Sequence, residues 1–167
     1  MTDVLAVLDR GRRLQFGFED LMRYHGPSSP GGVAHAFKVM ERAFPLLDGG
    51  APPERRAITV RTAFGGPGAR DAFEMATRAV TEGRYVVDRA LERPELGRAM
   101  ERFVFRVGYR GRAVTLVVRP GFVTDEFIDL ARTEARTAEQ EAHLDRLKLE
   151  MAERVMARPA DDVYDLT

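Results

Sequence analysis

The residues from His25 to Phe37 combine the types that could do chemistry. The loop 25–32 is rich in glycine, proline and serine and runs directly into an apolar segment that begins at Val33. Such a loop brings backbone N–H groups, a helix N-terminus and the His25 imidazole close together. This combination can bind an anion, a metal or a polar substrate.

A second glycine-rich loop, residues 65–71, also leads into an apolar-periodic segment. Asp71 and Glu74 are three residues apart, which places them on one face of the expected helix. The loop lacks the Lys-Ser/Thr ending of a P-loop and the spacing of a dinucleotide fingerprint. With Arg61 and Arg70 on either side, it could still hold the carboxylate or phosphate of a small substrate by charge-assisted hydrogen bonds.

The composition is that of a globular protein. Apolar residues make up 44% and charged residues 31% of the 167 positions, and no cysteine is present. The 26 basic and 26 acidic residues balance, so we expect no nucleic-acid partner and no membrane partner. No apolar run reaches the roughly 20 residues of a spanning helix, and no secretory signal is visible, which predicts a cytoplasmic protein. The absence of cysteine excludes disulfides, thiol nucleophiles and thiolate metal sites.

The elements that must position these residues can be predicted from periodicity. Residues 3–24 alternate apolar and charged positions at helical spacing and predict a helix that ends at the His25 loop. A second helix begins in that loop, with apolar residues at intervals of three or four: Val33, Phe37, Met40 and Phe44. Residues 48–56 predict a surface loop, and residues 57–64 have strand character.

The second half of the chain predicts a helix after the loop 65–71, a hairpin over residues 103–119, and a long helix or a pair of helices over 125–157. Small residues form a regular stripe along that last segment: Ile128, Ala131, Ala135, Ala138 and Ala142. Such a stripe permits close helix packing, including packing against another protomer. Few strand–helix alternations are present, so the order of elements favours an α+β domain.

Several segments together resemble the FmdE family of formylmethanofuran dehydrogenase components. They are residues 18–44, residues 65–88, the hairpin and the tail 150–164. In that family a helix ends in a His-Gly-His-x-Cys-Pro-Gly loop, and a later Cys-Gly-x-Asp-Ala-x-Gln segment opens a second helix. The resemblance implies one FmdE-like domain over residues 1–167, with a mixed or antiparallel sheet packed with helices. It also implies a homodimer, with residues 125–157 as a helical extension and possible dimer contact.

The chain departs from both family motifs at the metal ligands. Four residues match the first motif: His25, Gly26, Pro30 and Gly31. The second His of the family falls on Pro27, and its Cys falls on Ser29. In the second motif Gly68, Asp71 and Ala72 match, Glu74 stands at the Gln position, and no Cys is present. The metal site of His and thiolate that the resemblance implies is therefore not inherited.

A site of nitrogen and oxygen donors could have replaced it. His35 falls where the family tends to have Gly, about one turn into the second helix. His25, His35, Asp71 and Glu74 would form a set suited to Zn, Fe, Mn or Ni. Two His and one carboxylate would hold a Lewis-acid or redox metal with open positions. An axial role toward haem is a less favoured alternative.

Each of these residues also has a local alternative. His25 could bond within its own loop, and His35 could be a half-buried helix residue bonded to a neighbour. Asp71 could be a helix N-cap, with Glu74 completing a capping box. Ser28 and Ser29 have no adjacent base other than His25, and no nucleophile elbow surrounds them, which disfavours a serine hydrolase.

The sequence thus supports three hypotheses about function. The first is a small-molecule enzyme, of lyase, isomerase or hydrolase type, that uses acid–base or metal-assisted chemistry. Its expected catalytic residues are His25, His35 and Glu74, its metal ligands His25, His35 and Asp71, and its substrate-binding residues Ser28, Ser29, Arg61 and Arg70. The second is a non-catalytic module that binds a metal or metallo-cofactor. The third is a scaffold dimer whose site has decayed.

Overall fold

A computed structural model describes residues 3–167 of the chain. The helices are α1 (Phe18–His25), α2 (Pro30–Leu47), α3 (Pro67–Thr77), α4 (Asp125–Ala131), α5 (Ala138–Met156) and α6 (Ala160–Val163). The strands are β1 (Val4–Asp9), β2 (Arg12–Gly17), β3 (Ile58–Thr62), β4 (Tyr85–Val87), β5 (Val104–Tyr109), β6 (Arg112–Val118) and β7 (Tyr164–Leu166). Three short 3₁₀ turns cover Arg55–Ala57, Arg89–Leu91 and Pro94–Leu96.

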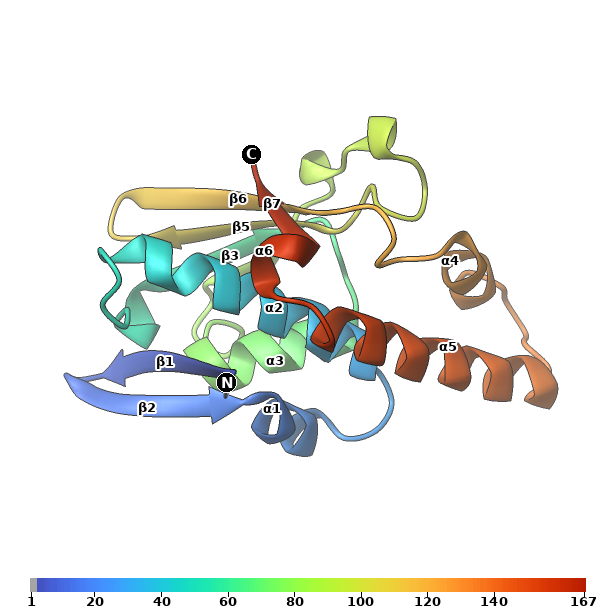
Figure 1. The fold of residues 1–167 in the computed structure, drawn as a ribbon, viewed down its shortest axis with the longest axis horizontal. Helices are drawn as coiled ribbons and strands as arrows, with labels where there is room; N and C mark the ends of the chain where they lie inside the picture. The colour runs from blue at the N-terminus through green and yellow to red at the C-terminus, as the bar shows by residue number, and fades with distance from the viewer. Residues whose placement is uncertain (1–2) are drawn as a thin grey trace.

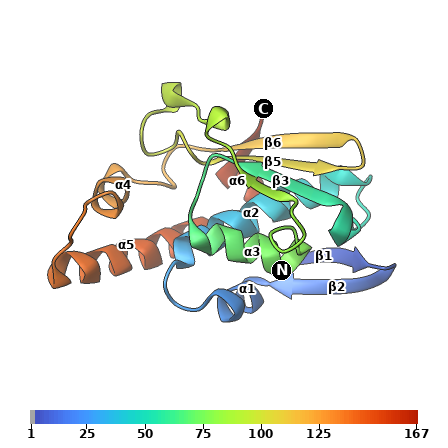
Figure 2. The same ribbon diagram turned by 180° about the vertical axis from the view of Figure 1, so that it is seen from behind.

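The main sheet has five strands in the order β4-β3-β5-β6-β7. Strands β3 and β4 run parallel, and every other pair is antiparallel. Helices α2 and α3 lie against one face of this sheet, and α1 with the β1–β2 hairpin lies on the far side of those helices (Figures 1 and 2). The mixed sheet covered by helices confirms the α+β class.

The N-terminal segment differs from the prediction of one helix over residues 3–24. It forms the β1–β2 hairpin, and only α1 at its end is helical. The turn is made by Arg10 and Gly11, both with positive φ (52° and 78°), which is the combination of a type I′ turn in a two-residue hairpin loop. Leu5 and Val7 point into the core at every second position, so the period is that of a strand.

The central predictions are confirmed. Helix α2 begins in the first glycine-rich loop, β3 lies within residues 57–64, and α3 begins in the second glycine-rich loop. The hairpin predicted over residues 103–119 is β5–β6, and its turn at Arg110 and Gly111 again has two positive φ angles (48° and 81°). The two glycine-rich loops therefore lead into α2 and α3, which pack against each other.

The C-terminal segment is a pair of helices, one of the two forms expected for residues 125–157, but the predicted inner stripe is wrong. Ala135 lies between α4 and α5 with a φ of 52°, and Ala138 and Ala142 are exposed. The buried face of α5 consists of larger residues, Leu144, Leu147, Met151, Ala152 and Val155, and α5 packs on α2. Helix α5 is therefore part of the core. None of the helices in residues 3–167 has the length and apolar character that a membrane crossing needs.

Candidate functional site

The first turns of α2 and α3 are in direct contact because both contain glycine. A Cβ on Gly68 would lie 2.4 Å from the carbonyl oxygen of Ser29, and a Cβ on Gly32 would lie 3.1 Å from the backbone nitrogen of Ala69. Real Cβ atoms are not found at the first of these distances. The two glycine-rich loops therefore bring two helix N-termini together.

Both of these N-termini keep their partial positive charge available. Each helix begins with a proline, Pro30 or Pro67, and neither has an acidic residue in its first turn. No side chain of the described residues caps either end. The N-cap of α3 is Gly66, so the alternative of Asp71 as N-cap and Glu74 as its capping-box partner is wrong. Two uncapped helix dipoles end at the same place, which favours negative charge there.

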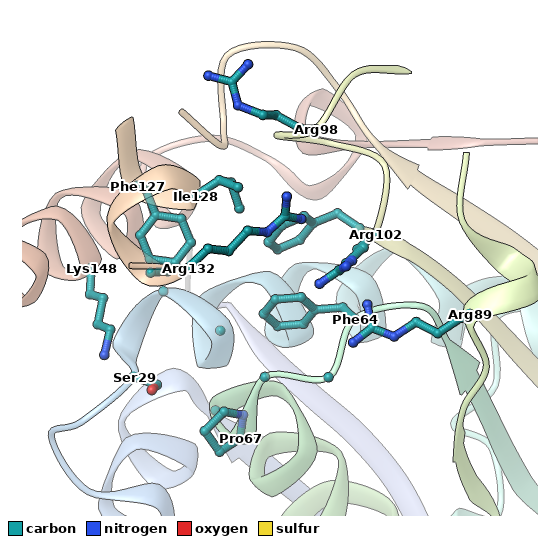
Figure 3. Close-up of a pocket in the computed structure, with 17 residues that line it drawn as sticks. Ser29, Phe64, Pro67, Arg89, Arg98, Arg102, Phe127, Ile128, Arg132 and Lys148 are labelled. Carbon is teal, nitrogen blue, oxygen red and sulfur yellow. The ribbon is translucent and has the colours of Figure 1, made fainter. Parts of the chain in front are cut away.

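Beside these helix ends lies a cavity of about 370 Å³, which we call the basic pocket (Figure 3). Its floor is the backbone of the two glycine-rich turns. Five basic side chains line it: Arg89, Arg98, Arg102, Arg132 and Lys148. Its apolar lining residues are Phe64, Phe103, Phe127, Ile128 and Ala131. Within the described part of the chain, no Asp or Glu lines this pocket.

The basic side chains are held in two different ways. The arginines form ion pairs with carboxylates that do not line the pocket, namely Asp125, Asp129, Glu92 and Glu101. Lys148 forms no ion pair with any carboxylate of residues 3–167, and its Nζ donates to the carbonyl oxygen of Ser28 at 3.1 Å. In Figure 3 Lys148 points from α5 toward Ser29, and Arg102 and Arg132 point into the space beside Phe64. Among the five basic side chains of the pocket, the ammonium group of Lys148 is thus the one whose charge is least neutralised by neighbouring carboxylates.

His25 lies at the centre of a hydrogen-bonded chain beside this pocket. Its Nδ1 is 2.8 Å from Oδ2 of Asp71, and its Nε2 is 3.2 Å from Oγ of Ser28. The His25 side chain is only 3% exposed. Arg70 donates to the other oxygen of Asp71 at 3.3 Å. Two of the expected site residues from distant parts of the sequence, His25 and Asp71, are therefore brought together.

His35 lies elsewhere, in the core. Its Nδ1 is 2.8 Å from the hydroxyl of Tyr164, and its ring packs on Phe103 at 4.8 Å between centroids. Its Nε2 has no partner with hydrogen-bond geometry in residues 3–167. Burial lowers the pKa of His35 to about 3, partly opposed by the backbone of Phe122, so the ring is neutral at ordinary pH. The alternative of a helix residue bonded to a neighbour fits, although His35 is fully buried and not half-buried, and the expected catalytic and metal-binding roles of His35 do not fit.

Glu74 is also engaged outside the site. Its carboxylate accepts hydrogen bonds from the backbone N–H and the hydroxyl of Thr81, and it pairs with Arg78 at 3.5 Å. These contacts fix the loop that follows α3. The expected role of Glu74 as a catalytic residue is therefore replaced by a structural one.

The expected metal site is not assembled. Among residues 3–167 no group of three or more His, Asp or Glu side chains is placed to hold a metal ion. Both ring nitrogens of His25 are engaged, and His35 is bonded to Tyr164. The basic pocket that Ser29 lines would repel a cation. The residues present therefore do not fit a divalent metal or haem iron.

The expected substrate-binding residues separate into two groups. Ser29 lines the basic pocket, and Ser28 adjoins it through its bond to Lys148. Arg61 pairs with Asp88 at 2.8 Å and does not line this pocket, and Arg70 pairs with Asp71. The basic lining residues could not be predicted from the sequence. Arginines are spread along the whole chain, so the four lining arginines cannot be told from the others. Among the basic lining residues only Lys148 is of a rare type, because the chain has two lysines.

The geometry defines a class of site: a cationic pocket with apolar walls, built on two helix N-termini, with a partly buried histidine–carboxylate pair at its edge. No family model and no curated protein matches this sequence.

Proposed function

We propose that the protein binds a small organic anion with an apolar body in the basic pocket. The observation that carries this proposal is the lining of the pocket: five basic side chains, no acidic one among the described residues, and two uncapped helix N-termini at its floor. Positive side chains and helix N-termini both stabilise negative charge. A metal cation would meet repulsion at the same place.

The two ends of the pocket suit the two parts of such a ligand. A carboxylate or phosphate would lie at the helix ends beside Lys148, where Gly31 and Gly32 contribute to the lining. An aromatic or aliphatic body would pack on Phe64 and Phe103, whose rings stack at 4.4 Å between centroids. A cavity of about 370 Å³ lies in the usual range for small-molecule sites, about 300–1,000 Å³.

We also propose that the chain has the fold of the FmdE family. The support is the contact between His25 and Asp71, which match separate motifs of that family and lie 2.8 Å apart. In this proposal the first motif keeps its histidine, whereas the position of the metal-binding Cys is taken by Ser29 on the wall of an anion pocket. A small-molecule enzyme remains the proposed class, with His25 as its acid–base residue, Asp71 as the carboxylate that orients it, and without a metal.

The proposal is tested by titrating the protein with phenyl phosphate, benzoate and neutral benzyl alcohol in a calorimeter at low salt. We expect both anions to bind and benzyl alcohol not to bind. Lys148→Met should weaken binding of phenyl phosphate by about tenfold or more, since a hydrogen bond to a charged group contributes about 1.5–3 kcal/mol. Added salt should weaken it as well.

Arg146→Met is the matched control. Arg146 is an exposed residue on the same helix as Lys148, it carries the same charge, and it does not line the pocket. We expect it to bind phenyl phosphate as the wild type does. Equal binding of benzyl alcohol and phenyl phosphate, or equal losses in the two variants, would contradict an anion site at the basic pocket.

A further inference from the structure

Three side chains form one hydrogen-bonded chain that ends at the surface. Asp71 comes from α3, His25 from the end of α1, and Ser28 from the loop between α1 and α2. The carboxylate is 2.8 Å from Nδ1 of the imidazole, and Nε2 is 3.2 Å from the Ser28 hydroxyl. Ser28 is exposed, whereas the His25 side chain is nearly covered. The order acid, histidine, serine is that of an activated serine nucleophile, a class that the sequence alone disfavoured.

The hydrogen bonds also fix which atom carries the proton. A carboxylate can only accept, so the Nδ1–H of His25 donates to Asp71. The free lone pair is then on Nε2, and it accepts from the hydroxyl of Ser28. Arg70 bonds the second oxygen of Asp71, which holds the carboxylate in place. The imidazole is therefore oriented as a base toward Ser28, the role that an acid–histidine pair has in acyl transfer.

This chain adjoins the basic pocket. Lys148 lines the pocket and donates to the backbone carbonyl of Ser28, and the next residue, Ser29, lines it as well. The first turn of α2 follows at once, and no side chain of the described residues caps its N–H groups. Backbone N–H groups at a helix start are donors suited to a developing oxyanion. An anion held in the pocket would thus present a neighbouring carbonyl near Ser28.

We propose that Ser28 is a nucleophile that hydrolyses esters of small organic anions, with His25 as its base and Asp71 as a positioning residue. The choice of an anionic ester rests on the proposed function of the basic pocket.

In the first half of the reaction, Oγ of Ser28 forms a bond to the acyl carbon and gives its proton to Nε2 of His25. The bond from the acyl carbon to the alcohol oxygen breaks, and the alcohol takes that proton. Water then attacks the acyl carbon and gives a proton to Nε2. The bond to Oγ breaks, Oγ takes the proton back, and the acid is released.

The nucleophile is tested with a neutral alkyl fluorophosphonate, which loses fluoride when a serine oxygen attacks its phosphorus. Mass spectrometry of the whole folded chain and of its peptides locates the adduct. We expect one adduct, on Ser28, which is lost in Ser28→Ala and kept in Arg146→Met. Asp71→Asn, checked for folding by circular dichroism, should slow labelling by about 100-fold or more, because the histidine loses its oriented tautomer. Absence of an adduct on Ser28 of the wild type, or unchanged labelling of Ser28→Ala, would overturn the proposal.

Hydrolysis of p-nitrophenyl hemisuccinate, with p-nitrophenyl acetate as the neutral comparison, tests the substrate class. We expect a lower KM for the hemisuccinate, and we expect Lys148→Met to raise that KM, whereas Arg146→Met, which does not line the pocket, should leave it unchanged. If phenyl phosphate binds but Ser28 is not labelled, the nucleophile is wrong and the anion pocket stands. If Ser28 is labelled but phenyl phosphate does not bind and both esters have the same KM, the anion pocket is wrong and the nucleophile stands.

Discussion

Acidification should destabilise the protein through His35. Burial lowers the pKa of this residue in the folded state to about 3, against an ordinary value of 6.5. The folded protein therefore keeps the neutral ring, while the unfolded chain binds a proton below pH 6.5. The contribution of neutral His35 to stability is fully present above that pH and is lost as the pH falls toward 3. Each pH unit in that window costs about 1.4 kcal/mol, so roughly 2 kcal/mol is lost at pH 5.

The assay is urea unfolding of the wild type and of a His35→Leu/Tyr164→Phe double variant at pH 7 and pH 5. The double variant removes the imidazole together with the hydroxyl that bonds it, so neither polar group is left without a partner. We expect the free energy of unfolding to fall by about 2 kcal/mol more in the wild type than in the double variant. Titration of other groups, such as Glu41, whose pKa is raised by burial, occurs in both proteins and cancels in the difference.

A single Tyr164→Phe variant separates the hydrogen bond from the titration. It leaves Nδ1 of His35 buried without a partner, which should cost about 1–3 kcal/mol at pH 7. Its loss of stability between pH 7 and pH 5 should still resemble that of the wild type, because the imidazole remains. The same pH dependence in the wild type and the double variant would refute the assignment of acid sensitivity to His35.

Three further predictions concern the elements around the pocket. Gly68→Ala should destabilise the fold by about 1–3 kcal/mol because its Cβ would overlap a backbone oxygen at 2.4 Å. Thermal unfolding checks this. Gly65→Ala is the control, since the atom nearest to a Cβ on Gly65 lies at 3.8 Å. Glu74→Ala should lower the free energy of unfolding by about 1–3 kcal/mol and leave the affinity for phenyl phosphate unchanged in calorimetry. A folded Glu74→Ala variant that no longer binds phenyl phosphate would show that Glu74 belongs to the site. Thr137→Ala removes the N-cap of α5 and should cost about 1 kcal/mol in urea unfolding, and an unchanged midpoint would contradict the cap.

Local signals in the sequence were enough for the elements that build the pocket floor. Glycine and proline mark the starts of α2 and α3, and the turn at Arg110 and Gly111 marks the β5–β6 hairpin. The same Arg-Gly pair occurs at Arg10 and Gly11, where it turns the first hairpin. There the apolar residues of β1 also fit the period of a helix, although Leu5 and Val7 alternate as in a strand. The turn signal was present in the sequence, so the wrong prediction of a helix came from the periodicity of the apolar residues.

Only the part of the site where the two glycine-rich loops meet was predictable from the sequence. The sequence placed His25 and Asp71 in one site, and they are bonded. It could not tell which way His35 points, because a residue in the first turns of a helix with apolar neighbours on several sides can face the site or the core. The cations of the basic pocket come from segments far apart in the chain: residues 89–102, Arg132 at the C-cap of α4, and α5. Only the tertiary arrangement brings those segments around Phe64.

The bond between His35 and Tyr164 joins two residues that are 129 positions apart. During synthesis at about 5–20 residues per second, roughly 6–26 s pass between the two residues. Until then the buried face of α2 lacks the strand β7 and the hydroxyl that completes its polar contact. The nascent chain must therefore hold an unfinished core until residues 164–166 leave the ribosome, and this interval is the one in which we expect it to depend most on chaperones.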